Sequence, residues 1–138
     1  MNAGCVLDAS AVLSLLVAGQ TTPVAKSFFL EPTHRWCAPR LLQLEVRNAI
    51  HRLERRGVIT VGSVDERLTL LESEIRFDEW ADEAMLTSIG ARARQASLSV
   101  YDATYLETAI RGEAALATRD AALISASRSA SVETFDLR

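Results

Sequence analysis

Short apolar runs alternate along the chain with longer stretches in which apolar residues recur every three or four positions. The short runs are typical of buried strands, and the periodic stretches are typical of amphipathic helices. Strands are predicted at residues 4–7, 36–38, 75–77, 114–118 and 132–135. Helices are predicted at residues 11–17, 23–30, 42–56, 64–71, 80–96, 100–110 and 121–127. This alternation predicts an α/β fold with a parallel sheet.

Capping residues mark several of the predicted helix starts. Ser10 is predicted to cap the first helix, and Pro23 takes the first position of the second. Ser63 and Glu66 have the spacing of a capping box, as do Ser99 and Asp102. The clearest amphipathic helix carries apolar residues at helical spacing up to a terminating glycine: Leu42, Val46, Ala49, Leu53 and Gly57.

The composition is that of one ordinary globular domain. With 138 residues, 49% hydrophobic and 24% charged, the chain is long enough to close one core, and we expect a single domain of residues 1–138. The longest apolar run, residues 11–18, is too short to span a membrane, and no basic N-terminal segment of a secretory signal precedes it. These features predict a cytoplasmic protein. Cys5 and Cys37 lack CxxC or histidine spacing and are interpreted as core residues.

The charge balance does not have the strongly basic character of a general nucleic-acid binder. The net charge is −3 and the isoelectric point is near 5.4. Acidic and basic counts nearly balance once four carboxylates discussed below are set aside, and all basic residues but Lys26 are arginines. Arginine binds phosphate groups in a bidentate manner, although genomic base composition would explain the same bias.

Four acidic residues are candidates for chemistry. Asp8 and Asp120 each follow a predicted strand directly, where ligands bind in open α/β sheets, but both positions also suit a helix N-cap. Asp102 has capping-box spacing from Ser99, so a structural role at the helix start would also explain it. Glu45 lies inside a helix at the margin of its apolar face, where either a salt bridge to Arg40 or Arg52 or a cation site would compensate its charge.

Four segments together resemble the PIN-domain nucleases and, within them, the VapC-type toxins of bacterial and archaeal toxin–antitoxin pairs. The segments are VLDAS at 6–10, LQLEVRNA at 42–49, SVYDATYLETA at 99–109 and LATRDAAL at 116–123. The resemblance covers nearly the whole chain. It implies a PIN-like three-layer α/β/α fold around a central, mostly parallel sheet.

The resemblance also implies a site and an activity. It assigns metal binding to Asp8, Glu45, Asp102 and Asp120, with Ser10, Asn48 and Thr118 as polar neighbours. Mg²⁺ or Mn²⁺ suits such a set of oxygen ligands, and a bound ion can activate water for hydrolysis of an RNA phosphodiester. A toxin of this kind is held inactive by a cognate protein antitoxin, and we expect a homodimer.

Two other functional classes fit the sequence less well. A catalytically silent PIN-like module that binds RNA or protein is disfavoured because all four carboxylates are present. A phosphotransfer enzyme with Asp8 as nucleophile is disfavoured because Ser10 replaces the second aspartate of a DxD motif. No P-loop, GxGxxG or HExxH occurs, and His34 and His51 have no zinc-site spacing.

Several other residues near the four segments could contact RNA, but a structural role is the preferred interpretation for each. The arginines beside the predicted site are more typical of a solvated charged face, and the two tryptophans of a core. These residues are Arg40, Arg47, Arg52, Arg119, Trp36 and Trp80.

Overall fold

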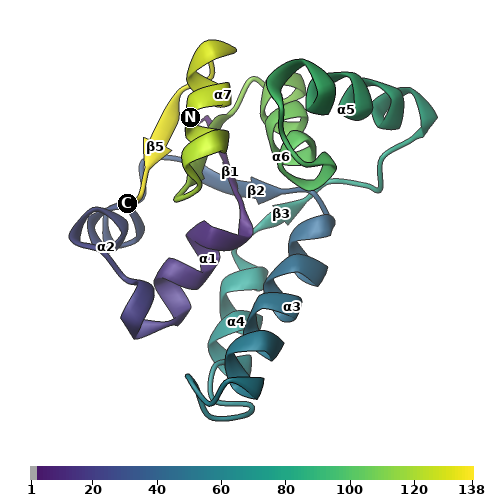
Figure 1. Cartoon of the computed structure of the whole chain (residues 1–138). Coiled ribbons are helices and arrows are strands. Elements are labelled where there is room, and N and C mark those ends of the chain that lie inside the picture. Colours follow the sequence, from purple (N-terminus) through teal and green to yellow (C-terminus); the bar gives the residue numbers. More distant parts are fainter. Residues whose placement is uncertain (1–2) are drawn as a thin grey trace.

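Five short strands form one parallel sheet in the order β3-β2-β1-β4-β5 (Figure 1). The computed structural model describes residues 3–138. The strands are β1 (Gly4–Leu7), β2 (Arg35–Ala38), β3 (Arg76–Phe77), β4 (Ala115–Thr118) and β5 (Thr134–Asp136). The earliest strand in the sequence is therefore the central one, and every pairing is parallel.

Helices cover both sides of this sheet. They are α1 (Ala9–Leu16), α2 (Pro23–Leu30), α3 (Leu41–Arg55), α4 (Asp65–Ser73), α5 (Glu83–Ala96), α6 (Val100–Arg111) and α7 (Ala121–Ser129), with a 3₁₀ turn, η1, at Ala18–Gln20. In Figure 1, α5, α6 and α7 lie above the sheet, and α1, α3 and α4 lie below it. The predicted three-layer α/β/α architecture is confirmed.

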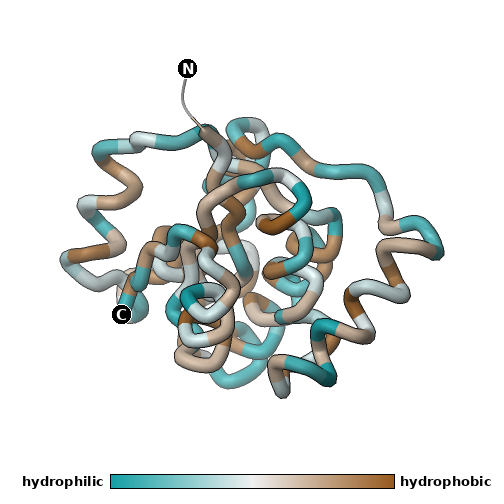
Figure 2. Tube along the Cα trace, turned by 90° about the horizontal axis from the view of Figure 1, so that it is seen from above, coloured by the Kyte–Doolittle hydropathy of each residue, from teal (hydrophilic) through white to brown (hydrophobic). Residues whose placement is uncertain are grey.

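The central strands are buried on both faces, which explains why they are almost entirely apolar. Cys5, Val6, Leu7, Leu116 and Ala117 are fully buried. Figure 2 shows hydrophobic and hydrophilic residues alternating along the outer helices, as expected when one face of each helix covers the core. In the described residues, no helix is both long and apolar enough to cross a membrane.

Three of the predicted helix starts are wrong. Asp8, not Ser10, caps α1, because its carboxylate directly follows β1 and reaches the N–H of Ala11. Asp82 caps α5 in the same way, so the helix begins at Glu83 and not at position 80. The predicted capping box of Ser63 is absent, because a turn through Gly62, with φ +78°, delays α4 to Asp65.

The two tryptophans have different environments. Trp36 packs against the core as predicted, but Trp80 is 63% exposed in the connection before α5. The prediction that both are core residues is therefore wrong for Trp80. Both cysteines are buried and unpaired, as expected.

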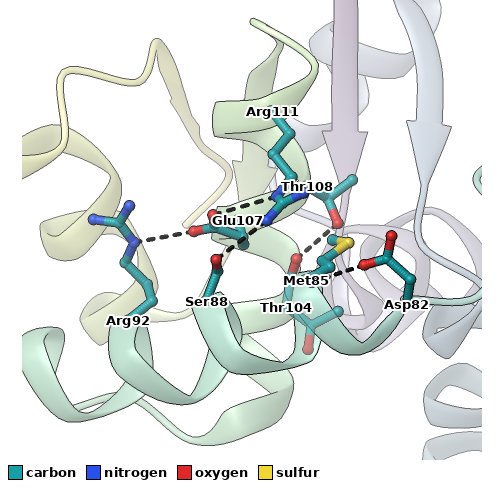
Figure 3. Close-up of polar contacts among 8 residues, drawn as sticks. All are labelled: Asp82, Met85, Ser88, Arg92, Thr104, Glu107, Thr108 and Arg111. Atoms are coloured by element: carbon teal, nitrogen blue, oxygen red, sulfur yellow. Dashed lines mark hydrogen bonds and ion pairs between the residues drawn. The ribbon is translucent and has the colours of Figure 1, made fainter.

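A buried carboxylate joins α5 to α6. Glu107 on α6 is 6% exposed, and its two oxygens face Arg92 of α5 at 3.2 Å and Arg111 of α6 at 3.5 Å (Figure 3). Arg111 also donates to the hydroxyl of Ser88 on α5. Because a buried charge is costly without partners, these contacts fix α5 against α6, the helix that carries Asp102.

Replacement of Arg92 by Met should therefore lower the free energy of unfolding by about 1–3 kcal/mol, because Glu107 would keep only its longer contact with Arg111. Urea unfolding measures this difference. Arg94→Met is the matched control, since Arg94 is exposed on the same helix, and its effect should stay within about 0.5 kcal/mol. Equal stability of the two variants would show that the Arg92–Glu107 contact does not hold the helices together.

Candidate active site

The candidate site lies where the chain changes direction across the sheet. The chain leaves β1 toward β2, whereas β4 pairs with the other side of β1. Leu7 pairs with Ala117, so residues 8 and 118–120 follow at the same edge of two neighbouring strands. Ligands bind at such a switch point in open α/β sheets, which is the reason Asp8 and Asp120 stood out in the sequence.

Asp8 is held by hydrogen bonds on both carboxylate oxygens. Oδ1 accepts from the Ser10 hydroxyl at 2.8 Å and the N–H of Ala11 at 2.9 Å, and Oδ2 accepts from the Thr118 hydroxyl at 2.6 Å. A carboxylate oxygen offers about two acceptor positions. Oδ2 is therefore the oxygen of Asp8 with capacity left for a ligand.

The two hydroxyls are themselves fixed by the main chain after β4. Ser10 accepts from the N–H of Arg119 at 2.8 Å, and Thr118 accepts from the N–H of Asp120 at 3.0 Å. Each hydroxyl therefore donates its proton to Asp8 and accepts a hydrogen bond from a backbone N–H. The hydroxyls of Ser10 and Thr118 thus fix the orientation of the Asp8 carboxylate.

Burial raises the pKa of Asp8. The side chain is 4% exposed, and desolvation brings the pKa from 3.8 to about 6, against the lowering effect of hydrogen bonds from Thr118, Ala11 and Ser10. The charge of Asp102 contributes in the same direction as burial. A bound cation would reverse this penalty.

Asp120 serves as the N-cap of α7. Its Oδ2 accepts from the N–H of Leu123 at 2.8 Å, so the capping interpretation is correct for Asp120 as it is for Asp8. Capping does not exclude a second role, because it uses one oxygen and leaves the other for a ligand. The charge of Asp120 also acts on Asp102.

Asp102 is the electrostatic centre of the four carboxylates. It lies in the first turn of α6, whose N-cap Ser99 accepts from the N–H of Asp102 at 3.0 Å. Burial raises its pKa from 3.8 to about 6, and the charges of Asp120 and then Glu45 add to the rise. Two other carboxylates, Glu45 on α3 and Asp120 at the N-cap of α7, therefore act on Asp102.

The predicted alternative for Glu45 does not occur. Arg47 of the same helix pairs with Glu72 of α4, at 2.7 Å, and neither Arg40 nor Arg52 forms an ion pair with Glu45. Among the described residues, none of the four candidate carboxylates lies within 4.0 Å of a basic group. No ion pair with a basic side chain therefore offsets their negative charges.

The donor set suits a hard cation. All four side chains offer oxygen, and Mg²⁺ characteristically keeps several waters and takes only one or two carboxylates from the protein. Within residues 3–138, no group of three or more Asp, Glu, His or Cys side chains is placed so that it could hold one metal ion together. An open arrangement of this kind fits a cation that shares its coordination with water and substrate.

The remaining predicted neighbours differ in their placement. Asn48 is exposed on α3, one turn after Glu45. Arg119 donates to the carbonyl of Gln20 at 2.6 Å and so braces η1. Tyr105, which the sequence interpretation passed over, lies buried beside the carboxylates. Its position three residues after Asp102, on the same face of a helix, was the feature that could have indicated it.

Comparison with known proteins identifies the family. A sequence profile of the PIN domain matches residues 5–128, so the chain belongs to the PIN-domain family. PIN domains are generally nucleases and usually use divalent metal ions. The matched region contains all four carboxylates. No curated protein sequence matches the chain.

Several solved structures are similar to this fold. PAE2754 from Pyrobaculum aerophilum is 21% identical, with a TM-score of 0.72 and coverage of 91% of this chain and 86% of the other. A toxin–antitoxin complex from Klebsiella pneumoniae is 16% identical, with a TM-score of 0.63 and coverage of 84% and 86%. VapC20 from Mycobacterium tuberculosis, a sarcin-ricin-loop-cleaving toxin, is 16% identical, with a TM-score of 0.60 and coverage of 88% and 94%.

Proposed function

We propose that this protein is a Mg²⁺- or Mn²⁺-dependent endoribonuclease that hydrolyses RNA phosphodiester bonds, with Asp8, Glu45, Asp102 and Asp120 as the metal-binding and catalytic residues. The observation that carries the proposal is that, among the described residues, no basic group lies within 4.0 Å of these carboxylates, while burial and the charges of Asp120 and Glu45 raise the pKa of Asp102. Proteins tolerate such clusters where a cation or a reaction requires them.

The residues of the chain divide the work. Glu45, Asp102, the free Oδ1 of Asp120 and the remaining position on Oδ2 of Asp8 would hold the cation, one or two of them directly and the others through its bound waters, while Ser10 and Thr118 orient Asp8. When bound, the cation supplies activation of water and neutralises charge on the phosphodiester. The carboxylates do not bind phosphate directly, because like charges repel, so the substrate needs separate cationic contacts.

Arg52 is the best placed residue for one such contact. It follows Glu45 by seven residues, or two turns of α3, and it is exposed. At a rise of about 1.5 Å per residue, the two positions are about 10 Å apart along the helix, within reach of a neighbouring phosphate for a long arginine side chain. Arg47 points to α4 and is occupied by Glu72.

Replacement of Arg52 by Ala should raise KM for RNA about 5- to 10-fold and leave kcat nearly unchanged, because one phosphate contact away from the reacting bond is lost. Steady-state cleavage at several salt concentrations measures it, and the dependence of binding on salt should become less steep. Arg67→Ala is the charge-matched control, because Arg67 is exposed on α4. Identical kinetics in both variants would place the RNA elsewhere.

We further propose that the protein is the toxin of a type II toxin–antitoxin pair of the VapC type, is neutralised by a cognate protein antitoxin, and acts in the cytoplasm as a homodimer. The support is the family membership together with the similar structures, which include a toxin–antitoxin complex and an RNA-cleaving toxin. Which RNA is cut follows from cleft shape and surface contacts that differ between members of one fold.

Calorimetric titration of the metal-free protein with Mn²⁺ and Mg²⁺, beside the same titration of Asp8→Asn, tests the proposed site before a substrate is known. Binding that disappears in the variant, and RNA cleavage that EDTA abolishes, would support the proposal. If the wild type neither bound metal, alone or with a non-cleavable RNA, nor cut any RNA, a silent RNA- or protein-binding PIN module would replace it.

A further inference from the structure

The hydroxyl of Tyr105 is a buried polar group without a partner. Tyr105 lies on α6 and is 1% exposed, and within the described residues its hydroxyl has no hydrogen bond. Most buried hydroxyls in proteins are bonded, and an unbonded one carries the full cost of its desolvation. A group kept at such a cost calls for an explanation.

The surroundings of this hydroxyl are carboxylates. Tyr105 follows Asp102 by three residues, so both side chains lie on one face of α6. Burial raises the pKa of Tyr105, and the next causes are the charge of Glu45 and a polar side-chain contact with Glu45, ahead of the charges of Asp8 and Asp102. The hydroxyl therefore keeps its proton and offers it beside Glu45, without reaching hydrogen-bond geometry.

Glu45 differs from Asp8 in its support. Asp8 is fixed by two hydroxyls and a backbone N–H, whereas Glu45 is a half-buried, longer side chain that forms no ion pair among the described residues. Carboxylates that bind metals are usually held by hydrogen bonds from a second layer of residues, whose loss typically reduces metal affinity 10- to 100-fold. The Tyr105 hydroxyl is a donor available to form such a hydrogen bond with Glu45.

We propose that Tyr105 is a positioning residue of the carboxylate site, whose hydroxyl donates to the Glu45 carboxylate in the metal-loaded protein. This role rests on the proposed function. In the metal-free protein the hydroxyl is unbonded, and in the working site it fixes one oxygen of Glu45 so that the other is presented to the cation. The tyrosine ring, packed in the core, sets the direction of the O–H.

Tyr105→Phe separates this role from a purely structural one, because it removes the hydroxyl and keeps the ring. Thermal unfolding without metal should give a midpoint equal to or above that of the wild type, since an unbonded polar group is lost. Mn²⁺ affinity measured by calorimetry should fall 10- to 100-fold. The kcat for RNA should fall while KM for RNA stays within twofold.

Two controls make the result specific. Tyr101→Phe, an exposed tyrosine on the same helix, should leave all three quantities unchanged. In a Glu45→Gln background, Tyr105→Phe should have little further effect on Mn²⁺ affinity, because the two residues act as one unit.

Wild-type Mn²⁺ affinity and kcat in Tyr105→Phe would overturn the role of Tyr105 and leave the proposed function standing. A large loss of metal-free stability would also overturn it, because the hydroxyl would then be bonded within the core. Full additivity with Glu45→Gln would show that Tyr105 acts on another group. A wild-type protein that neither binds metal nor cleaves RNA would refute the proposed function and this role with it.

Discussion

Asp102→Asn should lower kcat for RNA cleavage by about 10²- to 10³-fold and at the same time stabilise the metal-free protein. Asparagine keeps the shape of the side chain and removes the charge on which Asp120 and Glu45 both act. The lost charge weakens cation binding and relieves the repulsion that the folded protein carries without metal. A variant that is more stable and less active is the expected signature of a functional carboxylate.

Cleavage of a mixed RNA substrate and urea unfolding in EDTA measure the two effects. Glu79→Gln is the control, because it removes one negative charge from an exposed connection far along the chain from the four segments. Wild-type cleavage by Asp102→Asn would remove this residue from the site, and an equal loss in the control would attribute the effect to net charge.

The metal-free protein should become less stable as the pH rises from about 4 through 6. The pKa of Asp8 rises from 3.8 to about 6 on folding, so the folded state binds the proton more tightly than the unfolded state. The stability from this proton is fully present below about pH 4 and is lost above about pH 6. For the buried Asp8 it amounts to about 3 kcal/mol, and Asp102, which is half exposed, adds a smaller part.

Because about half of this stabilisation is present at pH 5, thermal unfolding in EDTA should show a midpoint roughly 5 °C higher at pH 5 than at pH 7.5. Carboxylates that are stabilised by arginines, such as Glu72 and Asp136, have lowered pKa values, so their contribution to stability has the opposite sign and is lost as the pH falls. Asp8→Asn should flatten the dependence, and saturating Mg²⁺ at pH 7.5 should restore the lost stability. A metal-free protein of equal or greater stability at pH 7.5 would contradict the raised pKa values.

The strands and the acidic candidates could be predicted because they depend on local features. Burial on both faces made β1 and β4 continuous apolar runs, and the end of each run located Asp8 and Asp120. The helix starts were less predictable, since Ser10 and Asp8 are both good capping residues. Asp8 is the capping residue only because α1 begins directly after β1, a feature that the local sequence does not show.

Features that depend on packing between distant segments were not predictable. The sequence allowed Glu45 either a salt bridge to Arg40 or Arg52 or a cation site, and only the packing of α3 shows that neither arginine pairs with it. Tyr105 looked like an ordinary apolar position of a helix, because nothing local shows that α3 brings Glu45 beside its hydroxyl. Tryptophan is a residue type that is often buried, but the late start of α5 leaves Trp80 in an exposed connection.

The bond between the Thr118 hydroxyl and Asp8 spans 110 positions of the sequence. A ribosome that has made the first hundred residues has therefore produced β1, α1 and the Glu45 helix but none of the residues that orient Asp8 from β4. Partial chains, whether nascent or cut short by a premature stop, lack the completed site.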